Sequence, residues 1–346
     1  MTKQVWVGSI PMGGGAPITV QSMTNTDSRD AAATLEQIRR LAESGCDIVR
    51  LSVYDADCVK ALHTIVPQSP VPLVADIHFD HTLAIGAIEQ GIAKVRINPG
   101  NVGGESKVAE LADCLKMHKI PVRIGVNSGS IEKEILARDG GVTARGMVES
   151  ALNHARMLEK RGFDDLVLSM KATNVRLTVD AYRLAAKMCE YPLHVGVTEA
   201  GLPGSGTVKS AVGIGALLLD GIGDTIRVSL TGDPVKEGPA GLEILRALEL
   251  RPGVDVISCP TCGRTCIDVE GIASAVRDAL KHRKTDLKVA VMGCVVNGPG
   301  EAREADIGIA GGKTGGMLFV KGEKPVTVRG DLAQILLSEI ERRFPE

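Results

Sequence analysis

The chain has 346 residues, and its 40 basic and 42 acidic side chains give a formal net charge of −2. This near balance argues against a nucleic acid as partner, because such proteins carry an excess of basic residues. The N-terminus MTKQVWVGSI lacks a signal-peptide pattern, and no stretch reaches the roughly 18 apolar residues of a membrane span. We therefore expect a soluble, cytoplasmic protein without a membrane partner.

The segment KQVWVGSIPMGGGAPI predicts a β-hairpin that turns at the three glycines of residues 13–15 and plugs the bottom of the following domain. From about residue 17 to 250, β-branched runs alternate with amphipathic helical segments, and this unit occurs eight times. The strand-like runs are ITVQSM, DIVRLSV, PLVADIH, KVRINPG, PVRIGVN, DLVLSMKA, PLHVGVTEA and DTIRVSL. Eight repeats predict a TIM (β/α)8 barrel. An open doubly wound sheet is the alternative, but the glycine-rich nucleotide turn typical of it is missing.

A Pro-Gly pair in RPGVD predicts the domain boundary, with the barrel over 1–253 and a second domain over 254–346. The second part contains several short strand-like runs, a helical segment over 265–283 and a final helix that starts at Asp331. This pattern is typical of a small α+β domain.

Polar side chains stand at the ends of the barrel strands, where the chemistry of TIM barrels takes place. They are Asn25, Arg50, Asp76, His78, Arg96, Asn98, Arg123, Asn127, Lys171, Glu199 and Ser229. Three arginines and a lysine at one mouth predict a phosphate or diphosphate ligand, because the guanidinium fork matches phosphate oxygens. Alternatively the arginines pair with Asp76 and Glu199, although these acids are too few for all four cations.

Two other residues of the mouth leave alternatives open. Glu199 is a candidate general acid or base, and structural ion pairing is an equal alternative. For His78 we favour a hydrogen-bonding role over a metal site shared with His81, since three residues across a strand-to-loop junction is a weak spacing for a metal pair.

The cysteines divide into two groups. Four are scattered singly, as small buried residues are, and four lie within residues 259–294, which indicates a metal centre instead of disulfides. Cys259-x-x-Cys262 and Cys294 can supply three thiolates to one metal centre. The fourth donor is open between Cys266, Glu301 and an exchangeable ligand, and a four-ligand zinc site is the alternative. A carboxylate donor fits an iron–sulfur cluster with one reactive iron, because it is held more weakly than a thiolate.

The motifs VQSMTNTDS, RINPGN, RIGVNSGS, SMKA, GVTEAG, CPTCGRT and NGPGEA together resemble the bacterial 4-hydroxy-3-methylbut-2-enyl diphosphate synthases, over essentially the whole chain. The resemblance implies a [4Fe–4S] cluster on Cys259, Cys262, Cys294 and Glu301, and so excludes Cys266. It implies reductive ring opening and dehydration of 2-C-methyl-D-erythritol 2,4-cyclodiphosphate by two electrons. Flavodoxin or ferredoxin would be the electron donor of this step in the non-mevalonate (MEP) pathway to isoprenoids.

The same resemblance implies roles for the residues of the barrel mouth. Glu199 would move a proton near the departing hydroxyl. Asp76, His78 and Asn98 are further candidate substrate-binding residues. The residues expected to hold the diphosphate are Arg50, Arg96, Arg123, Asn127, Lys171 and Ser229.

Chain connectivity predicts a homodimer. The last barrel helix runs back from the mouth, so the cluster domain starts at the far face of the barrel. A two-fold pair in which each cluster caps the partner's barrel solves this problem, and the family resemblance implies the same dimer. Two rivals remain: a zinc-stabilised barrel that binds or hydrolyses a phosphorylated metabolite, and an electron carrier or iron sensor that turns over nothing.

Overall fold

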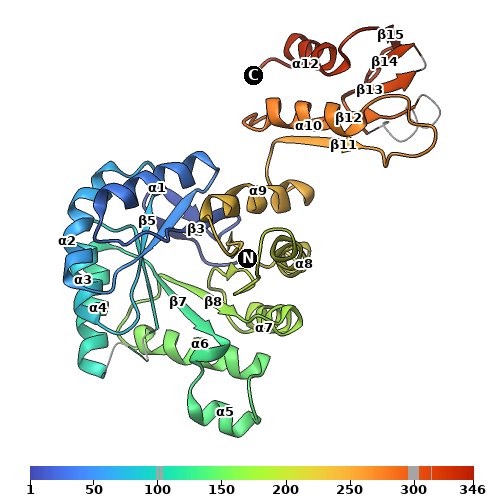
Figure 1. Ribbon diagram of the computed structural model, residues 1–346. Coiled ribbons are helices and arrows are strands. Elements are labelled where there is room, and N and C mark those ends of the chain that lie inside the picture. The colour runs from blue at the N-terminus through green and yellow to red at the C-terminus, as the bar shows by residue number, and fades with distance from the viewer. Residues whose placement is uncertain (99–100, 102–103, 295–303, 313) are drawn as a thin grey trace. The chain divides into compact units, whose positions relative to one another are not determined.

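The computed structural model describes residues 1–98, 101, 104–294, 304–312 and 314–346 (Figure 1). The chain divides into two compact units, Met1–Leu248 and Glu249–Glu346. The division lies a few residues before the Pro-Gly pair at 252–253 that we expected to mark it. Among the described residues, no helix is long and apolar enough to cross a membrane.

The first unit contains the expected TIM barrel. Its eight parallel strands lie in the order β8-β7-β6-β5-β4-β3-β10-β9. A bridge between Leu168 and Leu193 joins β8 to the segment before β9, so the sheet closes on itself. The strands are β3 (Thr19–Met23), β4 (Ile48–Ser52), β5 (Leu73–Asp76), β6 (Lys94–Ile97), β7 (Val122–Asn127), β8 (Leu166–Lys171), β9 (His194–Val195) and β10 (Thr225–Ile226).

Helices cover the outside of the barrel (Figure 1). They are α1 (Ala31–Glu43), α2 (Ala56–Ile65), α3 (His81–Glu89), α4 (Glu105–His118), α5 (Lys133–Asp139), α6 (Ala144–Glu159), α7 (Val175–Met188), α8 (Ser205–Leu219) and α9 (Glu237–Ala247). Side-chain caps fix several helix starts: Asp30 accepts a hydrogen bond from Ala33 N, and Asn174 accepts one from Leu177 N. The apolar helix faces pack on the outward residues of the strands and form the main core.

The N-terminal hairpin consists of β1 (Val5–Val7) and β2 (Ile10–Met12). Our expectation of a turn at residues 13–15 is wrong, because the strands are joined at Gly8, whose φ of 60° is a left-handed conformation that suits glycine. Val5, Val7 and Met12 pack against the lower inward-facing barrel residues Ile48, Val74 and Val167. The hairpin thus closes the bottom of the barrel, as expected.

Among its described residues, the second unit is a five-stranded sheet with two helices packed against each other. Strands β11 to β13 are parallel, and β14 and β15 follow as antiparallel neighbours. The elements are β11 (Val254–Ser258), α10 (Val269–Leu280), β12 (Leu287–Met292), β13 (Ile307–Gly312), β14 (Gly315–Val320), β15 (Val326–Val328) and α12 (Leu332–Arg343). The helix expected over 265–283 starts later, because Asp268 caps α10 by accepting a hydrogen bond from Gly271 N.

Candidate functional site

The inside of the barrel is mostly polar, whereas TIM barrels are usually filled by branched apolar side chains. Residues paired across neighbouring parallel strands point to the same side of the sheet, so the register identifies the inward positions. Arg96 pairs with Arg123, for example, and Thr225 pairs with both Thr19 and His194. The inward polar residues include Thr19, Gln21, Arg50, Asp76, Lys94, Arg96, Arg123, Ser169, Lys171, His194, Thr225 and Arg227.

Asp76, at the end of β5, lies at the centre of the cationic group. Arg96 Nη1 donates to Asp76 Oδ1 at 3.1 Å, and Arg50 Nε lies 3.8 Å from Oδ2. Burial disfavours the charged carboxylate, but Arg50 and Arg96 outweigh it and hold the pKa of Asp76 well below its usual range. Burial also lowers the pKa of Arg50, to about 10, which leaves this side chain charged at neutral pH. The alternative prediction, in which the arginines pair with acids of the mouth, therefore holds for Asp76 with Arg96 and Arg50.

Arg96 is held over a glycine of the next strand. Its Nη2 donates to the carbonyl of Gly125 at 3.3 Å, and its Nη1 also lies 3.1–3.2 Å from the ring nitrogens of His78. A Cβ at Gly125 would lie only 2.6 Å from Arg96 Nε. The glycine thus makes room for the guanidinium. His81, by contrast, lies away from His78 and contacts Glu110 at 3.2 Å, so the two histidines do not share a site.

Arg123 and Lys171 are buried cations without a carboxylate within ion-pairing distance among the described residues. Arg123 is 2% exposed, and within the described part of the chain its side chain forms one hydrogen bond, a long one of 3.4 Å to Gln21 Oε1. Burial and the surrounding arginines lower the pKa of both side chains. A bound anion would relieve this repulsion, which agrees with the expected phosphate or diphosphate ligand.

An ion pair that was not predicted from the strand ends lies next to these cations. Arg227 follows β10 and donates from Nε and Nη2 to the two carboxylate oxygens of Glu237, at 3.0 and 3.2 Å. Ser22 Oγ and Leu230 N also donate to this carboxylate, which is 1% exposed. Arg227 has the same inward direction as the arginines of the other strands, so the two-residue alternation of IRVS could have revealed it.

Two more missed residues lie one layer deeper. Lys94, at the start of β6, is fully buried, and its Nζ contacts only Met12 Sδ, at 3.9 Å, among the described residues. His194 is also fully buried, and neither ring nitrogen has a hydrogen-bond partner within the described part of the chain. Burial, reinforced by nearby cations, lowers the pKa of both side chains. Neither residue was predicted, because both stand at the amino ends of their strands, away from the mouth where the chemistry of a barrel is expected.

The remaining expected residues lie on the loops of the mouth. Glu199 is exposed, accepts a hydrogen bond from Thr173 Oγ1 at 3.1 Å, and adopts a left-handed φ of 51°. Such a conformation costs a residue with a Cβ about 1 kcal/mol and is often found at functional sites. Glu199 forms no ion pair with a described arginine or lysine. Asn98 is buried after β6, whereas Asn127 at the end of β7 and Ser229 after β10 are half-buried.

Cysteines gather at one end of the sheet of the second unit. Cys259 follows β11, and Cys294 follows β12 after Gly293. Because β11 and β12 are parallel, both cysteines lie at the carboxyl edge, where Gly293 N donates to Cys259 Sγ at 3.1 Å. Gly311 of β13 lies so close to this segment that a Cβ there would be 2.4 Å from Gly293 O. Glycine at position 311 thus allows β13 to pack closely against the segment that leads to Cys294.

Cys262 and Cys266 are exposed in the loop between β11 and α10. The loop is held by Thr265, whose Oγ1 accepts from Cys262 N at 3.0 Å, and by Cys266 N, which donates to Gly293 O at 2.9 Å. Cys266 Sγ donates to the carbonyl of Arg264 at 3.2 Å. Cys266 is exposed and lies before the start of α10.

The thiols at this edge are donors of the kind that an iron–sulfur cluster takes. All eight cysteines are free, and three of them, Cys259, Cys262 and Cys294, lie on the carboxyl side of two neighbouring strands. The expected fourth ligand, Glu301, lies outside the described residues. Within the described part of the chain, no three potential ligands are arranged closely enough to hold a metal ion.

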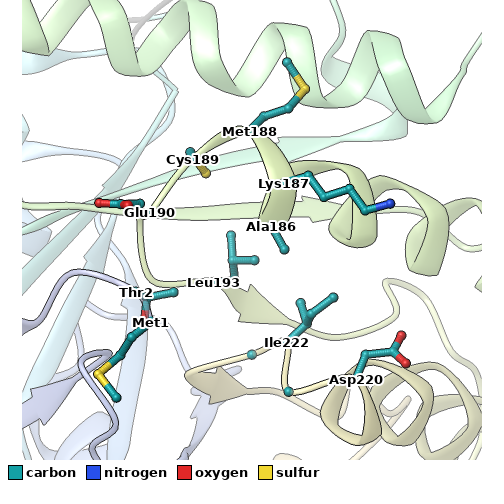
Figure 2. Close-up of a pocket in the computed structure, with 12 residues that line it drawn as sticks. Met1, Thr2, Ala186, Lys187, Met188, Cys189, Glu190, Leu193, Asp220 and Ile222 are labelled. Atoms are coloured by element: carbon teal, nitrogen blue, oxygen red, sulfur yellow. The ribbon is translucent and has the colours of Figure 1, made fainter.

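A hollow of about 580 Å³ lies elsewhere in the first unit, near the chain start (Figure 2). Its walls include Met1, Thr2, Met188, Cys189 and Ile222. None of the expected site residues lines it, and Lys187 and Asp220 at its margin do not form a cationic group like that of the mouth. We therefore place the candidate site at the barrel mouth and at the cysteines.

Comparisons with known proteins cover the whole chain. The family model "GcpE TIM-barrel domain" matches residues 2–242, and "GcpE protein C-terminal domain" matches residues 255–342. A protein of Caldanaerobacter subterraneus named 4-hydroxy-3-methylbut-2-en-1-yl diphosphate synthase (flavodoxin) is 56% identical, over 100% of this chain and 98% of its own length. A protein of Geobacter sulfurreducens with the same name is 55% identical, with coverage of 100% and 98%.

Solved structures agree on the fold. The 3-dehydroquinate dehydratase of Geobacillus kaustophilus matches with a TM-score of 0.51 at 13% identity, over 71% of this chain and 99% of its own. At that level of identity the match concerns the barrel architecture alone.

Proposed function

Because the chain belongs to the GcpE family of 4-hydroxy-3-methylbut-2-en-1-yl diphosphate synthases, we propose that it opens and dehydrates 2-C-methyl-D-erythritol 2,4-cyclodiphosphate with two electrons from flavodoxin. The product is 4-hydroxy-3-methylbut-2-enyl diphosphate, an intermediate of the MEP pathway. The observation that carries the proposal is the group of buried cations in the barrel, of which Arg123 and Lys171 have no carboxylate within ion-pairing distance in the described chain.

The charges of the reaction fit this barrel. The cyclic diphosphate dianion takes up two electrons and one proton, and yields the linear diphosphate trianion and water. One negative charge therefore develops on the diphosphate as the ring opens. Arg50, Arg96 and Arg123, with Lys171, would stabilise that charge in place, and fixed cations in a dry site are more effective than water at doing so.

The other mouth residues would orient the substrate and move protons. Asp76 fixes Arg96 and lies near Arg50, so the guanidinium groups need no reorganisation when substrate binds. His78, Asn98, Asn127 and Ser229 would complete the hydrogen bonds to the substrate. Glu199, exposed on its loop, would transfer a proton near the departing hydroxyl.

The cofactor in this proposal is a [4Fe–4S] cluster held by Cys259, Cys262, Cys294 and Glu301. When bound, it would supply the electrons to the substrate one at a time. The chain would favour this cluster through its three thiolates at one sheet edge and through Gly293 N, which donates to Cys259 Sγ. Free cysteines throughout the chain agree with a reducing compartment, and we place the enzyme in the cytoplasm.

The test is an iron and sulfide assay with an absorption spectrum on protein purified without oxygen, followed by turnover of the cyclic diphosphate with a reductant. We expect a brown protein with about four irons per chain and a broad absorption band at about 400 nm. Cys294→Ser should lose iron, whereas the matched variant Cys266→Ser should keep it. A colourless protein that contains zinc and does not need a reductant would contradict the proposal.

We further propose that the enzyme is a homodimer in which each cluster unit completes the partner's barrel. In the first unit, α9 returns toward the amino ends of the strands, where Leu242 contacts Gly45, so the chain leaves the barrel away from its mouth. A mixed dimer of a Glu199→Gln chain and a Cys294→Ser chain should contain one intact site. Its activity should therefore be about half that of a wild-type dimer. If mixing restores no activity although mixed dimers form, the shared site is wrong.

A further inference from the structure

A methionine sulfur lies between two arginines at the mouth of the barrel. Met23 ends β3, which lies between β4 and β10 in the sheet, and it pairs in register with Arg50 of β4. Arg50 Nε and Nη2 donate to Met23 Sδ at 3.1 and 2.9 Å. Arg227, which follows β10, donates from Nη1 to the same sulfur at 3.7 Å. The thioether is thus a shared acceptor for the two arginines that flank it.

Arg50 differs from the other paired arginines of the barrel in the kind of partner that it has. Arg96 donates to the carboxylate of Asp76 at 3.1 Å, and Arg227 donates to both carboxylate oxygens of Glu237 at 3.0 and 3.2 Å. Arg50 Nε is 3.8 Å from Asp76, beyond hydrogen-bond distance. Among the described residues, its hydrogen bonds go to the sulfur alone. The closest partner of Arg50 is therefore a neutral group.

The chemistry of a thioether suits this position. A guanidinium group donates from Nε and Nη2 along one edge, and a carboxylate on that edge would neutralise its charge. Sulfur is a weak acceptor without charge, so it orients Arg50 and leaves the positive charge and Nη1 for a ligand. Met23 is half-buried and shares the inward side of the sheet with Arg50, so both side chains belong to the mouth.

We propose that Met23 is a positioning residue that holds Arg50 ready for the diphosphate without neutralising it. This rests on the proposed function, in which Arg50 binds the diphosphate. An arginine side chain has several rotatable bonds, and one that is already held in place loses less entropy when the ligand binds. A carboxylate at position 23 would hold Arg50 as well, but it would compete with the diphosphate for the guanidinium and repel it.

Three substitutions separate this role from apolar packing. Met23→Gln keeps a neutral acceptor, Met23→Leu keeps an apolar side chain of similar volume without a sulfur, and Met23→Glu adds a charge to the shape of glutamine. Binding of the cyclic diphosphate to each anaerobic holoenzyme is measured by calorimetric titration. The matched control is Met117→Leu, which changes an exposed methionine of α4.

Affinity should decrease in the order glutamine, leucine, glutamate. Met23→Gln should bind within about twofold of the wild type, because its amide oxygen accepts from the same edge of Arg50. Met23→Leu should lose about three- to tenfold, since the ligand must then order Arg50 itself. Met23→Glu should lose at least about 100-fold. Met117→Leu should bind like the wild type, and thermal melting checks that each variant is folded.

Three results would overturn the positioning role. If Met23→Leu binds like the wild type and Met23→Gln binds more weakly, the side chain acts by apolar packing. If Met23→Leu binds more tightly than the wild type, the sulfur competes with the diphosphate for Arg50. If Met23→Glu binds as tightly as Met23→Gln, the neutrality of the holder is without effect. A wild type that binds no cyclic diphosphate would contradict the proposed function itself, and this failure is distinguishable because it is seen without any variant.

Discussion

A single methyl group at Gly125 tests the geometry of the barrel mouth. In Gly125→Ala, the new Cβ would lie 2.6 Å from Arg96 Nε and 3.0 Å from Nη2. Gly125 does not have a left-handed φ, so alanine can adopt its backbone conformation without strain. The side chain that must move is therefore Arg96.

The expected loss follows from the bonds that Arg96 makes. Displacement breaks its bond to the Gly125 carbonyl, 3.3 Å, and disturbs the 3.1 Å bond to Asp76. Loss of one charged hydrogen bond to the diphosphate costs about 1.5–3 kcal/mol, and since about 1.4 kcal/mol is tenfold, affinity should fall about 10- to 150-fold. The free energy of unfolding should change little. Alanine is favoured over glycine in a strand by about 0.5–1 kcal/mol, which offsets part of the cost of displacing Arg96.

Calorimetric titration with the cyclic diphosphate measures this loss directly. The control is Gly215→Ala in α8, where a Cβ meets nothing within 4 Å, so binding should stay at the wild-type level. Circular dichroism and thermal melting check that both variants are folded. A folded Gly125→Ala protein that binds within about threefold of the wild type would refute the inferred contact between Arg96 and the diphosphate.

Two further variants probe buried charges. Lys94→Met should raise the free energy of unfolding at pH 8 by about 1–4 kcal/mol, because it removes a buried amine whose described hydrogen-bond partner is a sulfur. Because burial lowers the pKa of Lys94 in the folded chain, the unfolded chain binds this proton more readily between that lowered pKa and about pH 10.5. The free-energy cost of the lysine therefore grows as the pH falls through this window, and the gain from Lys94→Met should shrink toward about pH 10. Urea unfolding across this range measures both, and a loss of stability at pH 8 would mean that the amine has a partner. Glu237→Gln should lower stability by about 3–5 kcal/mol in the same assay, because it removes the buried counter-charge of the half-buried Arg227. A loss below about 1 kcal/mol would show that this ion pair is not what holds β10 to α9.

The barrel could be predicted because each strand carries a run of β-branched residues and each helix an apolar face. The hairpin turn was placed wrongly because three consecutive glycines are a stronger sequence signal than the single Gly8, whose left-handed φ only the structure reveals. The start of α10 depended on the cap by Asp268, which competes with a longer amphipathic pattern.

The cations of the barrel mouth could be predicted from the residues at the strand ends. The buried Lys94 and His194 below them could not. Lys94 and His194 stand at the first positions of their strands, and sequence does not say how deep the polar interior extends. Glu237 begins α9 and pairs with Arg227, ten positions earlier, a contact that depends on how the loop between β10 and α9 folds back. The fourth cluster ligand, Glu301, stays a prediction.

In each barrel strand, different residues determine folding and ligand selectivity. The outward residues of each strand form an apolar ring with the helices, whereas the inward residues of the same strands hold unneutralised charge. These charges destabilise the folded barrel when no ligand is bound. An anion that binds inside the barrel stabilises the folded state, because it binds the folded chain and not the unfolded one. Evolution can therefore change the ligand by altering every second residue of a strand, while the residues between them continue to hold the fold together.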